Sequence, residues 1–148
     1  EAEREAFLIR FEETPPEGLI GFCVMGGIFS EGIDLKAERL IGAIVVGPGL
    51  PQVCRERELL KNFYDARGED GFFYAYLCPG MNKVLQAAGR VIRTSEDVGI
   101  IVLLDERFRQ YSYRRMFPRE WEQVVPVTVD TVAKKVERFW DAWLWQQR

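Results

Sequence analysis

The segment QAAGRVIR, residues 86–93, carries side chains that suit phosphate binding at a spacing typical of one helix face. At about 100° per residue, Gln86, Arg90 and Arg93 fall within an arc of about 60°. An arginine guanidinium is planar and permanently charged, so it can bind two phosphate oxygens at once. The same pattern is compatible with an exposed stripe whose arginines pair with nearby acids such as Glu96 and Asp97. The segment therefore predicts either an anion-binding face or an ordinary solvated one.

The helix predicted to carry this stripe, at about residues 81–93, is otherwise apolar, and Asn82 and Lys83 lie at the flanks of the stripe. Gly89 falls beside the stripe, although a glycine inside a helix costs about 1 kcal/mol relative to alanine. We expect this glycine to permit close approach of a backbone or a ligand. The residues expected to pack on the opposite side are Met81, Val84, Leu85, Ala87, Ala88, Val91 and Ile92.

A second group of candidate residues lies in the segment GGIFSEGIDL, residues 26–35. It follows an apolar stretch that predicts a buried strand, and open α/β sheets bind ligands at the carboxyl ends of their strands. Backbone N–H groups around a glycine can approach a nucleotide, and a carboxylate can bind a ribose hydroxyl. The candidate residues are Ser30, Glu31, Gly32 and Asp34. By itself the segment is equally compatible with a glycine-rich turn.

The elements that would position these groups alternate between apolar strands and helices. Residues 19–27, 41–49 and 99–105 are almost continuously apolar, which is typical of parallel strands covered on both faces. The periodicity predicts helices over residues 1–13, 53–67, 81–93 and 128–148. The alternation indicates an α/β fold with a mainly parallel sheet flanked by helices.

Further expectations concern individual elements. Leu59, Leu60 and Phe63 should face inward from helix 53–67. Residues 124–129 are compatible with an edge strand, since Pro126 could not donate to a central ladder. We expect one domain over residues 1–148, with the helix at 128–148 packing on it. The first helical pattern has no capping residue before it, which suggests a piece of a longer protein.

Composition excludes several classes of site. The 20 Lys and Arg residues nearly balance 23 Asp and Glu residues, so nucleic-acid binding would have to use local basic clusters. The absence of histidine excludes a Ser–His or Cys–His dyad, and no metal site is predicted. The three cysteines form no CxxC pair, which favours reduced thiols in a cytoplasmic protein. No apolar run reaches the length of a membrane span, so no membrane partner is expected.

A basic cluster and the C-terminal helix are each compatible with two interpretations. Arg107, Arg109, Arg114 and Arg115 form a basic cluster that is either a solvated face or a contact for single-stranded DNA. The C-terminal helix carries an apolar stripe that either packs on this domain or docks on a neighbouring one. The stripe consists of Val129, Val132, Val136, Phe139, Trp140, Trp143 and Leu144.

Together, GGIFSEGIDL and QAAGRVIR resemble motifs V and VI of superfamily 2 DNA helicases of the DinG/XPD (Rad3-related) family. The resemblance covers roughly residues 5–125 and includes ERLIGAIVVGPGLPQ, DVGIIVLLDERF and YRRMFPREW. It implies the later part of the second RecA-like motor domain, without its first strand or strands. The parent protein would be an ATP-dependent DNA helicase that moves 5′→3′ on single-stranded DNA.

The resemblance also implies roles for the candidate residues. Arg90 and Arg93, with Gln86, would face ATP and Mg²⁺ bound mainly by the N-terminal motor domain of the same parent, and the two arginines would act as arginine fingers. Gly32 and Asp34, with Ser30, Glu31 and Gly89, would contact the nucleotide or couple it to DNA. Many family members carry an iron–sulfur cluster in the first motor domain. Its ligands would lie outside this chain, which leaves the cluster in the parent an open question.

The alternative is a non-catalytic RecA-like module that binds DNA or protein. The intact Gln86, Gly89, Arg90 and Arg93 favour the motor, and the parent's upstream sequence would discriminate the two, because a motor needs a Walker A loop and a DEAH-type acid pair there.

The 148 residues alone are expected not to hydrolyse ATP, because they contain no GxxxxGK[ST] loop and no DEAH or DEAD segment. A phosphate-release assay on the purified chain checks this. ATP turnover that exceeds a buffer control and copurifies with the protein would contradict this expectation.

Overall fold

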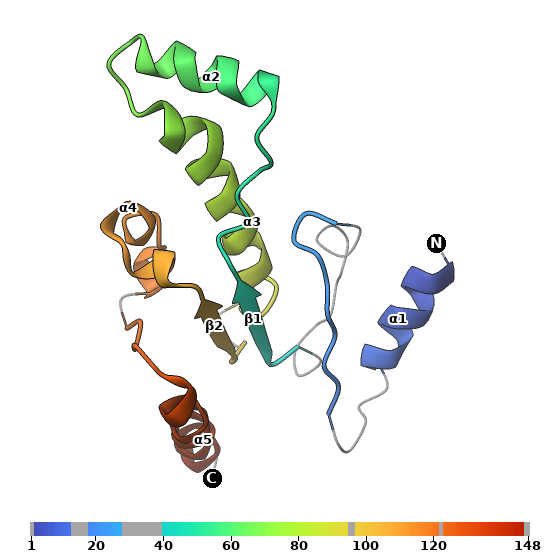
Figure 1. The fold of residues 1–148 in the computed structure, drawn as a ribbon. Helices are drawn as coiled ribbons and strands as arrows, with labels where there is room; N and C mark the ends of the chain where they lie inside the picture. Colours follow the sequence, from blue (N-terminus) through green and yellow to red (C-terminus); the bar gives the residue numbers. More distant parts are fainter. Residues whose placement is uncertain (1, 13–17, 28–39, 95–96, 122, 147–148) are drawn as a thin grey trace. The chain divides into compact units, whose positions relative to one another are not determined.

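The computed structural model describes residues 2–12, 18–27, 40–94, 97–121 and 123–146 (Figure 1). The chain divides into two compact units, residues 1–116 and 117–148, which are described separately. The first unit combines helices with a small parallel sheet, so the predicted α/β class is confirmed.

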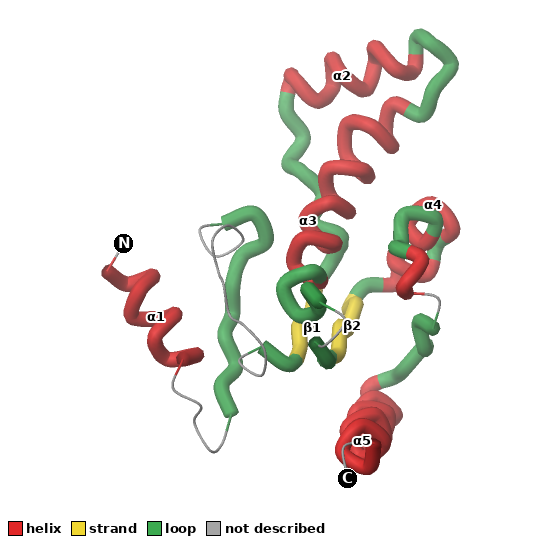
Figure 2. Tube along the Cα trace, turned by 180° about the vertical axis from the view of Figure 1, so that it is seen from behind, coloured by secondary structure: helices red, strands yellow, loops and turns green. Residues whose placement is uncertain are grey.

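The sheet of the first unit consists of β1 (Gly42–Val46) and β2 (Ile100–Leu104), which run parallel with Gly42 opposite Ile100. The strands predicted at 41–49 and 99–105 are therefore confirmed, and Figure 2 shows them side by side. Val45 is buried, whereas Ile44 is 67% exposed and Val46 is 69% exposed. Because alternate residues of a strand face opposite sides, one face of β1 is packed and the other is open. The predicted coverage of both faces is wrong for the residues described.

The strand predicted at residues 19–27 is not formed. Residues 18–24 make no ladder with the described strands, and the chain turns at 25–27, where Gly27 N–H donates to the Val24 carbonyl at 3.0 Å. Ile20 and Phe22 are 82% and 93% exposed, because no described element covers them. The preceding helix α1 (Ala2–Glu12) confirms the first predicted helix, and its Phe7 and Phe11 rings lie against Gly21.

A helical hairpin follows β1. Helix α2 (Arg55–Asp65) is joined by a short turn to the π-helical segment η2 (Phe73–Leu77), which continues directly into α3 (Cys78–Ala88). Leu59, Leu60 and Phe63 are 61%, 39% and 55% exposed, so their predicted inward orientation is wrong.

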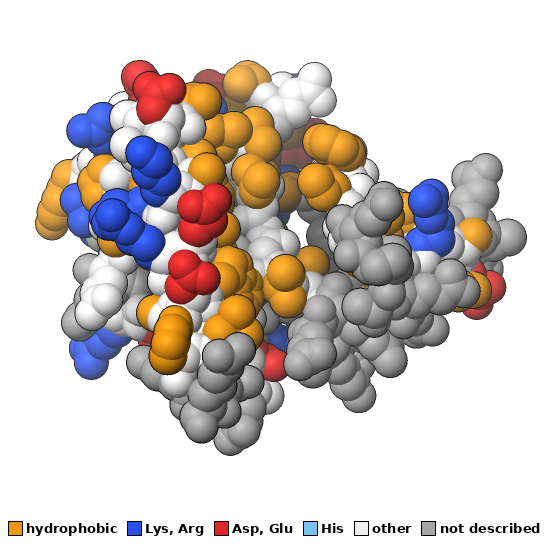
Figure 3. Space-filling model, turned by 90° about the horizontal axis from the view of Figure 1, so that it is seen from below, with side chains coloured by type: hydrophobic (Ala, Val, Ile, Leu, Met, Phe, Trp, Pro, Cys, Tyr) orange, Lys and Arg blue, Asp and Glu red, His pale blue; other side chains and the backbone are white. Residues whose placement is uncertain are grey.

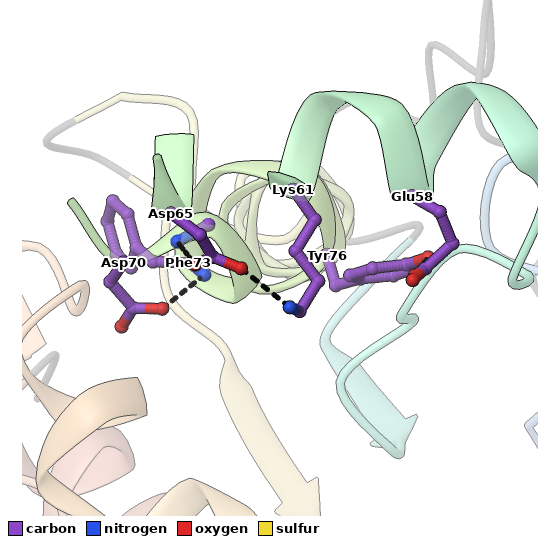
Figure 4. A network of polar contacts seen from close by, with 7 residues as sticks. Glu58, Lys61, Asp65, Asp70, Phe73 and Tyr76 are labelled. Carbon is purple, nitrogen blue, oxygen red and sulfur yellow. Dashed lines mark hydrogen bonds and ion pairs between the residues drawn. The ribbon is translucent and has the colours of Figure 1, made fainter. Parts of the chain in front are cut away.

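The face of α2 that meets η2 is polar (Figure 4). The Tyr76 hydroxyl donates to the Glu58 carboxylate, and Arg57 Nη1 donates to the Ala75 carbonyl at 2.7 Å. The hydrogen bond to Glu58, together with desolvation, raises the pKa of Tyr76 to about 12. A sequence pattern that looks only for apolar faces misses this contact, because the partners of the buried Tyr76 and of the Ala75 carbonyl are a half-buried carboxylate and a half-buried guanidinium.

The turn between α2 and η2 is fixed by side chains that bond the backbone. Asp65 accepts from Lys61 Nζ at 2.7 Å and from the Gly71 N–H at 3.0 Å, and Asp70 accepts from the Phe73 N–H at 2.9 Å (Figure 4). Gly68 turns with φ +75°, in the left-handed region that glycine adopts without steric cost. The hairpin therefore closes through specific hydrogen bonds.

The core of the first unit lies between α3, β1 and the segment after β2. Gly80, near the start of α3, lies so close to the Pro48 carbonyl and Leu50 that a Cβ there would be 2.7 Å from the carbonyl oxygen. After β2, η3 (Glu106–Arg109) and α4 (Tyr111–Arg114) supply two aromatic core residues. The buried apolar side chains are Val45, Ala75, Tyr76, Leu77, Met81, Val84, Ala88, Val91, Phe108 and Tyr113.

The second unit contains the short helix η4 (Arg119–Trp121) and the long helix α5 (Val129–Gln146). The helix predicted at 128–148 is confirmed over these residues, while its packing on the first unit stays a prediction. The edge strand predicted at 124–129 is wrong, since residues 124–128 adopt no regular structure and Val129 already starts α5. Of the helices in the described part of the chain, none combines the length and apolar character needed to span a membrane.

Substitution of Gly71 by alanine is expected to destabilise the first unit by about 1–3 kcal/mol, because the new Cβ would collide with the Lys61 carbonyl. Gly42→Ala is the matched control, since its Cβ would lie at 3.4 Å from the Ile100 carbonyl oxygen, an ordinary contact. Chemical unfolding of the two variants measures the difference. Equal stabilities would show that the α2–η2 turn does not need the close approach.

Candidate functional site

The polar stripe begins on α3 and continues past its end. Gln86 is exposed on the last full turn, and α3 ends at Ala88. The next residues bond in the tighter i→i−3 pattern, with Arg90 N–H donating to the Ala87 carbonyl at 3.2 Å and Val91 N–H to the Ala88 carbonyl at 3.0 Å. The predicted helix 81–93 therefore starts three residues earlier and stops five residues earlier than expected.

This early end changes the positions of the two arginines. Arg90 lies on the tightened turn and is half-buried, whereas Arg93 lies beyond it, in an exposed segment without helical structure. The helical projection that places Arg93 on the stripe is wrong, because a 100° step applies only to residues within the helix. Ile92, expected to pack, is 44% exposed, while Met81, Val84, Ala88 and Val91 are buried as predicted.

Gly89 forms the C-cap of α3 with an ordinary right-handed backbone, φ −65°. A Cβ there would lie 3.2 Å from the Leu85 carbonyl oxygen, and no described side chain from another element comes within 4 Å. The close approach of another backbone, expected from sequence, is therefore not found among the described residues. A ligand at this position stays a prediction.

The segment that carries Arg93 is held by Asp97. The Asp97 carboxylate accepts the backbone N–H of Arg93 at 2.9 Å and of Thr94 at 2.8 Å. These two hydrogen bonds, with a smaller contribution from the Arg93 charge, lower the pKa of Asp97. Asp97, considered from sequence as an ion-pair partner, thus mainly fixes the backbone before β2. Glu96 lies outside the described residues.

Of the second motif, only its first residues are described. Ser30, Glu31, Gly32 and Asp34 lie outside the described residues, whereas Gly26 and Gly27 end the segment at 18–27. Gly26 has φ +78°. The side chain of Lys83 from α3 lies beside it, so that a Cβ on Gly26 would be 3.3 Å from Lys83 Cε. The structure thus brings the start of GGIFSEGIDL against the helix that carries Gln86.

Comparison with known proteins connects this arrangement to a family. The helicase C-terminal domain family model matches residues 1–124. The chain belongs to this family, in its Rad3/XPD type. The resemblance seen in GGIFSEGIDL and QAAGRVIR is confirmed, and the first unit is a partial RecA-like helicase C-terminal domain.

Several helicases resemble the chain over much of its length. An ATP-dependent DNA helicase, chl-1, of Caenorhabditis elegans is 38% identical over 105 residues, which is 67% of this chain and 12% of that protein. A regulator of telomere elongation helicase 1 of Bos taurus is 35% identical, over 77% of this chain and 10% of that protein. A probable ATP-dependent helicase of Methanocaldococcus jannaschii is 27% identical over 83% of this chain and 21% of that protein. The chain therefore spans only about a tenth to a fifth of these relatives.

The four arginines of the basic cluster differ in their contacts within this helicase domain. Arg107 binds Asp105 through two hydrogen bonds, at 2.9 Å and 2.8 Å, and also donates its backbone N–H to Asp105. The Arg115 guanidinium lies 4.4 Å from the centre of the Phe73 ring, which links the α4 region to η2. Arg109 and Arg114 are exposed. Two of the four arginines thus have structural contacts that the spacing in the sequence did not indicate.

In the described part of the helicase domain, no three His, Cys, Asp or Glu side chains lie close enough together to bind a metal ion. Cys23, Cys54 and Cys78 are free thiols. Partial burial raises the pKa of the Cys23 thiol, although its side chain is exposed.

The Asp105–Arg107 pair makes a testable electrostatic prediction. Arg107 holds the pKa of Asp105 at about 2, below its ordinary 3.8, so the folded state favours the charged carboxylate. The stabilisation is present above about pH 4 and is lost as pH falls through about 2. Titration of the Asp105 carboxyl by NMR should give this low pKa, and Arg107→Gln should raise it. Arg109→Gln is the matched control and should leave it unchanged; an equal shift in both variants would contradict the pairing.

Proposed function

We propose that this chain is the part of the second motor domain that completes the ATP site of a Rad3/XPD-type DNA helicase. In this proposal Arg90 and Arg93 face the phosphates of an ATP held by the first motor domain of the same protein. Gln86 contacts the same nucleotide, and Gly32 and Asp34 link it to DNA. The intact QAAGRVIR motif in a chain that belongs to this family is the observation that carries the proposal.

The geometry of α3 suits a role in a site shared between two domains. Gln86 is exposed on the helix, and Arg90 follows on a turn whose backbone is fixed by hydrogen bonds to Ala87 and Ala88. The apolar side of the same helix is buried in the core through Met81 and Val84. The side chains that would meet a nucleotide are therefore supported by a packed element, which limits their reorganisation when charge develops.

The chemistry required of the arginines is charge stabilisation. In phosphoryl transfer the equatorial oxygens carry negative charge in the transition state, and an arginine supplied from another domain can raise turnover by about 10³–10⁵. Mg²⁺ would be held by acids of the first motor domain. No role toward the ion is proposed for this chain, since its described residues offer no cluster of carboxylates.

DNA would be the second ligand of the motor. We propose movement along single-stranded DNA in the 5′→3′ direction, driven by changes at the shared ATP site. All four arginines of the basic cluster are exposed, but Arg107 is bound to Asp105 and Arg115 is stacked on Phe73, so Arg109 and Arg114 are the members proposed to contact a phosphate backbone.

The decisive experiment replaces single arginines in the full-length parent. Arg93→Ala is expected to lower ATP turnover by at least about 10³ while the KM for ATP changes by only a few-fold, because the lost charge acts in the transition state. Arg90→Ala tests the second finger in the same assay. The matched control is Arg55→Ala, which removes an exposed arginine at the start of α2.

Near-normal turnover of Arg93→Ala would refute its assignment as an arginine finger. A wild-type parent that binds DNA but hydrolyses no ATP would refute the motor and identify a non-catalytic binding module instead.

A further inference from the structure

Three segments of the first unit meet at a junction built around three glycines: the turn at 25–27, the exit of β1 at 47–50, and the start of α3 at 80–83. Gly80 lies against the Pro48 carbonyl and Leu50. A Cβ on Gly49 would lie 3.1 Å from Met25 Cε and 3.5 Å from the Gly80 carbonyl oxygen. At Gly26 and Gly49, which both have positive φ, a Cβ would press on the Lys83 and Met25 side chains, whereas at Gly80 it would collide with backbone. We call this group, with Lys83, the glycine junction.

Lys83 is the side chain that spans the junction. Its Cβ lies 3.7 Å from the Cβ position of Gly49, and its Cδ, Cε and Nζ lie 3.6, 3.3 and 3.5 Å from that of Gly26. The side chain therefore covers both glycines, and its outer end, ammonium included, lies against Gly26. Lys83 is half-buried, and within the described part of the chain its ammonium makes no hydrogen bond or ion pair.

The position of Lys83 connects the two motifs. It lies three residues before Gln86 on α3, so the two side chains share one face of the helix. Its other contact is the turn from which the chain enters the motif that contains Asp34. Since the Lys83 side chain lies against Gly26, a shift of this turn relative to the polar stripe would displace that side chain.

We propose that Lys83 is a positioning residue, whose stem holds the Met25–Gly27 turn in register with α3 and so transmits DNA binding to the ATP site. This rests on the proposed function. The contact that matters in this proposal is the packing of the side chain over Gly26 and Gly49, which its length supplies and its charge does not.

The test uses the full-length parent with two substitutions that separate stem from charge. Lys83→Ala removes both, whereas Lys83→Met keeps an unbranched apolar stem and removes the charge. Lys134→Ala, on an exposed position of α5, is the matched control. The measurements are ATP turnover and KM with and without saturating single-stranded DNA, and amide hydrogen exchange of residues 25–27 and 86–93.

We expect Lys83→Ala to lower the stimulation of turnover by DNA at least about fivefold, the lower end of typical coupling between sites. The KM for ATP should stay unchanged, and exchange at 25–27 should become faster. Lys83→Met should retain the stimulation by DNA within about twofold, because methionine keeps most of the packing over the two glycines; a twofold change is small on the scale of coupling between sites. If Lys83→Ala does not fold, Gly26→Ala serves instead, because the strain at φ +78° and the new Cβ against the Lys83 side chain would both move the turn away from α3.

Equal losses in Lys83→Met and Lys83→Ala would overturn the proposal in favour of a role for the charge. A lower unfolding temperature with unchanged DNA stimulation would overturn it in favour of a purely structural lysine. Hydrogen exchange separates the failure of this proposal from that of the proposed function. A wild-type parent that hydrolyses no ATP refutes the proposed motor function. Unchanged exchange at residues 25–27 in Lys83→Ala refutes the positioning role of Lys83.

Discussion

The close packing of α3 against the exit of β1 is the constraint on which the first unit depends. Gly80 approaches the Pro48 carbonyl so closely that only a residue without a side chain fits. This contact sets the position of α3 on the sheet, and Met81 and Val84 are fully buried beside it. The polar residues further along α3 take their place from this packing, since a helix moves largely as a rigid element. The ATP-facing geometry proposed for Gln86 and Arg90 thus originates several residues earlier.

A second organising feature is the hydrogen-bonded hairpin of α2 and η2. Its contacts join a carboxylate to a phenol (Figure 4) and a guanidinium to a carbonyl. The apolar residues of α2 stay exposed. Buried polar groups are stable only when their hydrogen bonds are satisfied. Such an interface defines one geometry more strictly than an apolar one, because each donor needs its own acceptor.

The sequence predicted the parts of the fold that depend on local pattern. The apolar runs at β1 and β2 and the helical periodicity of α2, α3 and α5 are strong signals, and all five elements exist. It failed where a neighbour decides the outcome: residues 19–27 have the composition of a strand, but no described strand pairs with them. It also failed at the end of α3, since periodicity continues through Val91 and Ile92 while the backbone already tightens after Ala88.

The sequence identified the residues of the candidate site, but it predicted their positions in space less well. Gln86 follows from helical spacing, whereas Arg90 lies on the tightened turn after α3 and the backbone of Arg93 is bound by Asp97. Lys83 was visible at the flank of the stripe, but its contact with Gly26 depends on a turn with positive φ that no periodicity reveals. The residues of the second motif from Ser30 to Asp34 lie outside the described residues.

The open face of β1 has a practical consequence for work with the isolated chain. Ile44, Val46 and Leu104 lie exposed on the small sheet, with Ile20 and Phe22 exposed before it, and Figure 3 shows hydrophobic side chains at the surface among charged ones. Exposed apolar side chains, such as the paired Val46 and Leu104, promote self-association in water. A net charge of −3 provides little electrostatic repulsion between copies. In solution the isolated chain should therefore be least soluble at high salt and high protein concentration, where the remaining repulsion is screened.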